Sequence, residues 1–244
     1  MNASNTIGFF GKLPAHGDFI YRCLPTNFIN VWDGWLQSFV KCSQEQLGES
    51  WLDIYLTSPI WRFAFSEGVV DQHAWVGIVL PSVDRVGRYF PFSIAARLSP
   101  EQNPLELIAQ TAWFEAIEAL ALRALDGQIA IDDLIVEINS HTPNQTNAYS
   151  SGASLTQHSG AVITIDGEDQ SPSSAIAPLF HSLLKNGLSS YSAWTTQGSD
   201  LVEPCLFYCT GLPSMQNLAA MLDGQWAARG WNQPLRIATG NPSF

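Results

Sequence analysis

The sequence predicts an α+β protein: an antiparallel sheet with flanking helices, followed by a smaller α+β part. Three short runs rich in Val, Ile, Phe and Trp follow one another between residues 60 and 97. Their short connections favour antiparallel neighbours. Two long stretches of the first part carry apolar residues at helical spacing. Of the 244 residues, 46% are hydrophobic and 14% are charged, as expected for a well-buried globular chain.

The first part is expected to follow the order β-α-β-β-β-α. After a short apolar start, large apolar side chains form one stripe over residues 26–47, which predicts a helix that Gly48 ends. The three strands that follow are expected over residues 60–66, 74–80 and 90–97.

A second helix is expected from a cap at Asn103, with Pro104 at its first position, to a terminal Gly127. Adjacent strands with short connections imply an antiparallel sheet whose faces are covered by helices. This order is similar to that of the longin and roadblock group of interaction domains, by analogy at the level of fold.

The expected division is a first domain over residues 1–138, a linker over 139–160 and a smaller part over 161–244 packed on the first. Residues 139–160 contain no Lys, Arg, Asp or Glu and few large apolar residues, which is typical of a flexible linker or a long loop. In the smaller part, strands are expected over residues 161–165, 190–194, 205–209 and 235–238, and helices over 174–185 and 215–222.

Composition excludes several classes of function. The net charge of −11 makes nucleic acid and anionic lipid poor partners, because phosphate groups require clustered Lys and Arg. No run of 18 apolar residues and no secretory signal is present, so a cytoplasmic protein is expected. The four cysteines are too scattered for a disulfide framework or a zinc site, and we expect neither metal nor cofactor. The oligomeric state stays open.

Two stretches, residues 8–25 and 81–92, combine Gly, Pro, aromatic residues and charges of both signs. Together with residues 58–65 and 192–198, and more weakly 211–213, they resemble the signature of the TagF (ImpM) family. This family consists of accessory and regulatory proteins of the bacterial type VI secretion system. The resemblance implies a post-translational repressor that binds a forkhead-associated scaffold protein, and it supplies no catalytic residue.

Positive charge gathers in or beside these signature stretches, which hold six of the 11 Lys and Arg residues. We expect residues 8–25 and 81–91 to lie side by side at one edge of the sheet. Asp18 and Asp84 would then hold arginines in place, and at least one of Arg85 and Arg88 would face the partner.

The remaining candidates are aromatic and basic residues of the types enriched at interface hot spots. Trp61 and Arg62 are expected on opposite faces of one strand, where core packing or structural pairing is the alternative to partner contact. The full candidate set for partner binding or for the signature loops is Lys12, Asp18, Trp61, Arg62, Ser82, Asp84, Arg85, Arg88 and Trp194.

The preferred interpretation is a protein without catalytic activity. The alternatives are a hydrolase that uses Ser82 with His16 and either Asp84 or Asp18, and a small-GTPase-type interaction platform. An enzyme requires a concave pocket in which titratable groups converge, whereas an adaptor needs only a surface patch.

Overall fold

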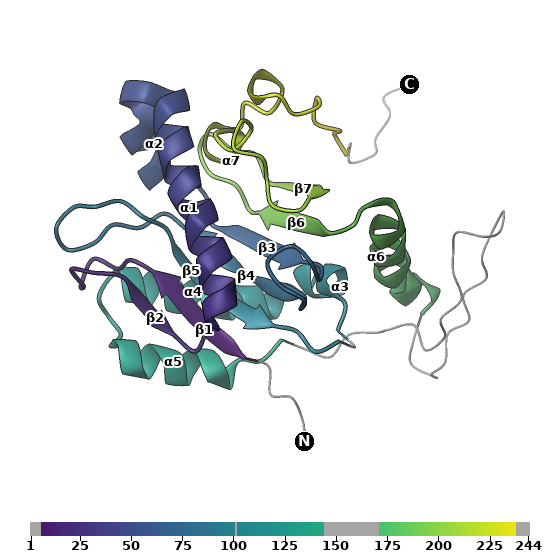
Figure 1. Cartoon of the computed structure of the whole chain (residues 1–244), viewed down its shortest axis with the longest axis horizontal. Coiled ribbons are helices and arrows are strands. Elements are labelled where there is room, and N and C mark those ends of the chain that lie inside the picture. Colours follow the sequence, from purple (N-terminus) through teal and green to yellow (C-terminus); the bar gives the residue numbers. More distant parts are fainter. Residues whose placement is uncertain (1–5, 101, 144–170, 238–244) are drawn as a thin grey trace, which may run out of the picture.

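The computed structural model describes residues 6–100, 102–143 and 171–237 of the chain. Its centre is a seven-stranded sheet in the order β2-β1-β5-β4-β3-β6-β7 (Figure 1). All neighbouring strands run antiparallel. In that spatial order the strands are Ile20–Arg22, Ile7–Gly11, Phe92–Arg97, Trp75–Leu80, Trp61–Phe65, Tyr191–Thr196 and Cys205–Thr210.

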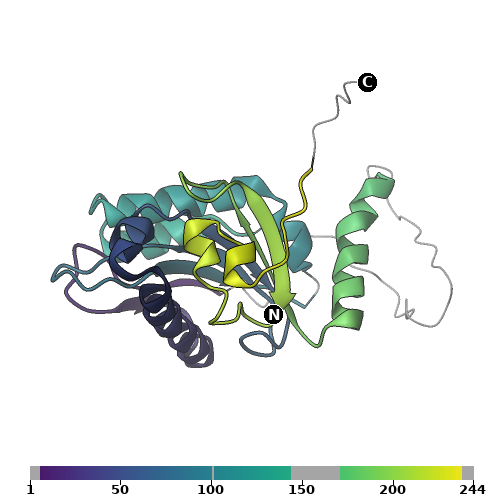
Figure 2. The ribbon, with the colours of Figure 1, turned by 90° about the horizontal axis from the view of Figure 1, so that it is seen from above.

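Helices cover both faces of the sheet, so the fold has three layers (Figures 1 and 2). One face carries α1 (Thr26–Leu47), α2 (Trp51–Leu56) and α7 (Ala220–Asp223). The other carries α3 (Pro104–Ile108), α4 (Thr111–Leu125), α5 (Ile131–Ser140) and α6 (Ile176–Gly187). Three single turns of 3₁₀ helix, η1 (Gly48–Ser50), η2 (Pro172–Ala175) and η3 (Ala227–Arg229), complete the regular structure of the described residues.

The core is divided by the sheet into two clusters, because alternate residues of each strand face opposite sides. On β3, Trp61, Phe63 and Phe65 join the cluster beneath α1, whereas Ala64 joins the cluster on the opposite face. The stripe predicted for α1 packs on the first cluster, where Trp32 and Trp35 are buried and stack with Trp194 of β6.

The antiparallel α+β class is confirmed, and helix 26–47 and the three strands between residues 60 and 97 fall within two residues of their expected bounds. The predicted order β-α-β-β-β-α is incomplete, since β2, α2 and α5 were not expected. The helix expected from Asn103 to Gly127 is two helices, α3 and α4, because Gln110 between them adopts an extended conformation.

The later residues extend the sheet of the first part, because β6 pairs with β3 and β7 pairs with β6. Residues 139 and 140, expected to begin the linker, end α5. Residues 235–237, expected in a strand, have no regular structure. The helix expected over residues 215–222 is shorter than predicted, since α7 covers only Ala220–Asp223. The rest of the expected linker from residue 144, and the strand expected at 161–165, lie outside the described residues.

Two connections meet at one end of the strands. Loop 12–19 joins β1 to β2, and loop 81–91 joins β4 to β5. Because β1 pairs with β5 in a register that sets Gly11 opposite Phe92, the two loops leave the sheet next to each other. Figures 1 and 2 both show them projecting side by side. We call them the loop pair.

Candidate functional site

Hydrogen bonds between the two loops confirm that they lie side by side. The backbone N–H of Arg85 donates to the carbonyl oxygen of His16 over 2.9 Å. The hydroxyl of Ser82 donates to the carbonyl of Lys12 over 2.7 Å, and the guanidinium of Arg88 donates to the carbonyl of Gly17. Side chains of one loop therefore satisfy backbone groups of the other, which fixes both loops as one unit.

Asp84 lies at the centre of the loop pair. Its carboxylate accepts Nζ of Lys12 at 2.8 Å and Nε of Arg88 at 2.6 Å. It also accepts the backbone N–H groups of Val86 and Arg88 at 3.0 and 2.9 Å. Burial by itself would raise the pKa of Asp84, but these hydrogen bonds to the charged form outweigh it and hold the pKa well below its ordinary value.

The close approach of the loops depends on Gly11. Its φ is +138°, and a Cβ at this position would lie 2.2 Å from the carbonyl oxygen of Pro91. Only glycine fits both the conformation and the contact. Below the loops, the buried phenol of Tyr55 donates to the carbonyl of Ser82 and accepts from its N–H, both over 3.1 Å.

The outer surface of the loop pair carries apolar side chains, the guanidinium of Arg85 and the carboxylate of Asp18. Arg85 is exposed, and among the described residues its guanidinium has no carboxylate partner. Its position is nevertheless set by its backbone bond to His16 and by Gly17, where a Cβ would lie 3.3 Å from a guanidinium nitrogen. Val86 beside it is 66% exposed, and Phe19 is 39% exposed. We call these three residues, Phe19, Arg85 and Val86, the loop tip.

Other predicted site residues lie elsewhere. Asp18 does not hold an arginine: its carboxylate accepts the backbone N–H of Phe19. Trp61, Arg62 and Trp194 are at most 4% exposed. As predicted, Arg62 lies on the face of β3 opposite Trp61, where it forms a bidentate pair with Glu118 of α4 at 2.6 and 2.9 Å. These three residues are core and do not reach the surface of the loop tip.

The side chains proposed for a hydrolase are engaged in other bonds. The Ser82 hydroxyl is committed to a backbone carbonyl, and Asp84 is committed to two cations. No histidine of the described residues is hydrogen-bonded to either. Nor do the described residues contain a group of three or more His, Cys, Asp and Glu side chains placed to hold a metal ion. The geometry does not assemble a nucleophile with its base.

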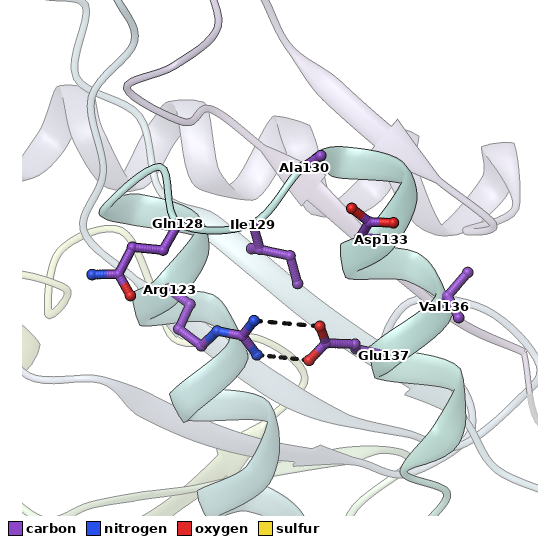
Figure 3. A pocket seen from close by; sticks show the side chains of 7 residues that line it. All are labelled: Arg123, Gln128, Ile129, Ala130, Asp133, Val136 and Glu137. Carbon is purple, nitrogen blue, oxygen red and sulfur yellow. Dashed lines mark hydrogen bonds and ion pairs between the residues drawn. The ribbon is translucent and has the colours of Figure 1, made fainter.

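A hollow of about 250 Å³ lies between α4 and α5 (Figure 3). Arg123 and Glu137 line it and form an ion pair at 2.6 Å, and Ile129 lies beside that pair. These two charges match each other, and the exposed carboxylate of Asp133 adds a further charge to the lining.

A cluster of titratable side chains secures α6. The phenol of Tyr191 lies 2.6 Å from Nδ1 of His181, and Lys185 pairs with Glu67. Burial raises the pKa of Tyr191, so its phenol keeps its proton within this hydrogen bond to His181. Burial and the charge of Lys185 lower the pKa of His181, although Glu67 acts in the opposite direction.

This cluster predicts a pH-dependent stability. Since the pKa of His181 is lower in the folded than in the unfolded chain, acid favours the unfolded chain, which takes up the proton first. The contribution is complete above the ordinary histidine pKa of about 6.5 and is lost as the pH falls below it. We expect the melting temperature to fall between pH 7 and 5 less steeply in His181→Phe than in the wild-type protein. Parallel curves for the two proteins would contradict this assignment.

Val86, Phe19 and Tyr55 were not singled out in the sequence analysis. For Val86 a signal was available, since an apolar residue between Arg85 and Gly87 in a turn is expected to be exposed. Tyr55 offered none, because its contact with Ser82 joins residues 27 apart through the packing of α2.

Binding residues of proteins are often carried by ordered loops on a rigid scaffold. The fold and the loop pair place this chain in a class of binding proteins of that kind. It is a three-layer α+β protein whose distinctive surface is a pair of loops held together by hydrogen bonds. In the described part of the chain, no helix is both long and apolar enough to cross a membrane.

Comparisons with known proteins identify the family. The model of the TagF N-terminal domain, type VI secretion system-associated, matches residues 8–140. The crystal structure of PA0076 from Pseudomonas aeruginosa PAO1 is 32% identical and matches with a TM-score of 0.77, over 97% of this chain and 100% of that chain. No protein with a curated description matches. The chain belongs to the TagF family and is therefore an accessory protein of the type VI secretion system.

Proposed function

We propose that this protein is a non-catalytic, post-translational repressor of type VI secretion. It acts in the cytoplasm by binding a forkhead-associated scaffold protein through the loop tip. The resemblance of its signature segments to those of the family motivates the role and the partner. The observation that carries the site is Arg85, an exposed cation on a braced loop in a chain of net charge −11.

The loop pair divides into two groups of residues with different roles. Lys12, Ser82, Asp84 and Arg88 make the internal bonds that hold the loops. The loop tip contributes Arg85, and arginine is among the residue types enriched at interface hot spots, together with the apolar side chains of Phe19 and Val86. A rigid arrangement suits binding, because little conformational entropy is lost when the partner docks. Arg85 would meet an anionic group of the scaffold, and Val86 would fill an apolar depression.

The test is capture from native cytoplasm, with the bound proteins identified by mass spectrometry. Wild-type protein is expected to retain the scaffold, whereas Arg85→Glu and Val86→Asp should lose it while their melting temperatures stay unchanged. Val136→Asp is a matched control, since Val136 is 69% exposed but lies on α5. Equal recovery of the scaffold by wild type and both loop variants, or no recovery by any of them, would contradict the proposal.

A further inference from the structure

The segment over residues 232–237, which we call the tail, carries two of the most exposed apolar side chains of the described residues. Leu235 and Ile237 are each 98% exposed. They alternate along the tail, as the apolar residues of a half-buried strand do. The sequence predicts a strand here, yet the tail has no regular structure and no backbone hydrogen bond to another described segment. Its strand-forming residues lack a partner within the described chain.

The strand beside the tail has a free edge. β7 is the last strand of the sheet, and among the described residues none pairs with its outer side. Natural edge strands are usually protected by a charge, a proline or a bulge. β7, with the sequence Cys-Leu-Phe-Tyr-Cys-Thr, has no charge and no proline. Leu206 and Tyr208, on one of its faces, are 57% and 49% exposed.

The tail is not paired with β7 of its own chain, since no backbone hydrogen bond joins these two described segments. It runs beside β7 in both views (Figures 1 and 2). Side-chain contacts hold the chain directly before the tail, at Trp231, and within it, at Arg236. The ring of Trp231 lies 4.9 Å from that of Phe207, and Arg236 pairs with Glu203 at 3.2 Å. Glu203 precedes β7, so the contact of Arg236 lies beyond the start of that strand.

We propose that residues 234–237 of one copy pair as an antiparallel strand with the free edge of β7 in a second copy, in a reciprocal exchange. A tail from a second copy can approach the edge of β7 without these intrachain contacts. It can place Leu235 opposite Tyr208 and Ile237 opposite Leu206, so that apolar side chains meet on one face. Phe180 of α6 already packs against Tyr208, with 6.1 Å between ring centroids, and supports that face.

Electrostatics favour a second copy at this place despite the acidic chain. Two ion pairs lie near the tail and α6, Arg236 with Glu203 and Lys185 with Glu67. They neutralise part of the charge at this surface, which lessens the repulsion that a net charge of −11 would cause between two copies. Reciprocal exchange uses the same two elements of each copy, as in a closed two-fold dimer.

Sedimentation velocity of the full chain between about 1 and 100 μM tests the exchange by mass action. We expect a monomer–dimer equilibrium whose dissociation constant rises at least about tenfold in Leu235→Asp/Ile237→Asp and in Tyr208→Asp. Leu206→Lys tests the edge a second time in case Tyr208→Asp does not fold. Val136→Asp, at an apolar site of α5 that is 69% exposed, should leave the dimer unchanged.

Mixing two variants separates exchange from general adhesion of apolar surfaces. The tail variant keeps an intact β7, and Tyr208→Asp keeps an intact tail, so a mixture regains one of the two contacts. The mixture should therefore form more dimer than either variant alone. A wild-type monomer at the highest concentration, a dimer insensitive to the variants, or a mixture no better than its components would overturn the proposal.

Discussion

Replacement of Asp84 by Asn is expected to lower the melting temperature by at least about 6 °C, one of the two largest effects in the molecule. The carboxylate of Asp84 has no exposed surface, and the Lys12 side chain beside it is 6% exposed. An amide keeps the shape but not the charge, and it turns an N–H₂ group toward cationic donors. The buried ammonium of Lys12 would be left without a counter-ion.

Two further variants test whether the lower melting temperature of Asp84→Asn comes from the unpaired Lys12. Asp18→Asn should change the melting temperature by less than about 2 °C, because Asp18 is exposed and its contact is to a backbone N–H. Arg88→Ala should have an intermediate effect, since Arg88 is 57% exposed and Lys12 keeps its pair. Asp18→Asn and Asp84→Asn with equal melting temperatures would show that the buried cation is stabilised by something else.

The pKa of Asp84 adds a second loss of stability in acid, with a different cause from that of His181. Hydrogen bonds to the charged form lower the pKa of Asp84, whereas burial lowers that of His181. The pKa of Asp84 is lower in the folded chain, so its contribution is complete above about pH 4, the ordinary range of an aspartate, and is lost as the pH falls further. Acid unfolding, followed by circular dichroism, should therefore begin at a higher pH in a variant with weakened loops, such as Arg88→Ala, than in the wild-type protein.

Replacement of Glu118 is expected to cause the second large loss of stability. Glu118→Leu should lower the free energy of unfolding by about 3–5 kcal/mol, because it leaves Arg62, whose side chain is 5% exposed, as an unpaired charge in the core. Chemical denaturation would measure this loss. The guanidinium also lies 5.3 Å from the ring centroid of Phe114, a contact that is too weak to replace a carboxylate.

The double variant Arg62→Met/Glu118→Leu makes this explanation specific. Replacing both charges with apolar side chains removes the desolvation cost together with the pair, so most of the lost stability should return. A double variant as unstable as the sum of its parts would mean that packing volume, and not an uncompensated charge, dominates at this position.

Much of the fold could be predicted because its signals are local. The stripe of α1 and the β-branched and aromatic runs of β3, β4 and β5 each specify their own conformation. The membership of β6 and β7 in the same sheet was not predictable, since it depends on pairing between residues more than 120 apart, such as Ala64 with Ala193. The three-residue β2 exists only because β1 provides a template beside it.

The candidate site shows the same division. The proximity of the two signature loops could be predicted from their shared composition and charge. The roles of individual residues could not, because pairing depends on which carboxylate is buried. Asp84 holds both Lys12 and Arg88, whereas Asp18, with the same chemistry, points to solvent and holds neither. Arg85 was therefore distinguished from Arg88 only by the structure.

The most direct test of the loop tip as the partner-binding surface is a calorimetric titration of the isolated forkhead-associated scaffold with wild-type and Arg85→Glu proteins. Both proteins should unfold at the same temperature, because the Arg85 side chain makes no ion pair in the described chain. We expect Arg85→Glu to weaken binding by on the order of 2 kcal/mol, about thirtyfold, since it inverts a charge at the interface. Unchanged affinity in an equally stable Arg85→Glu protein would show that the loop tip does not bind the scaffold.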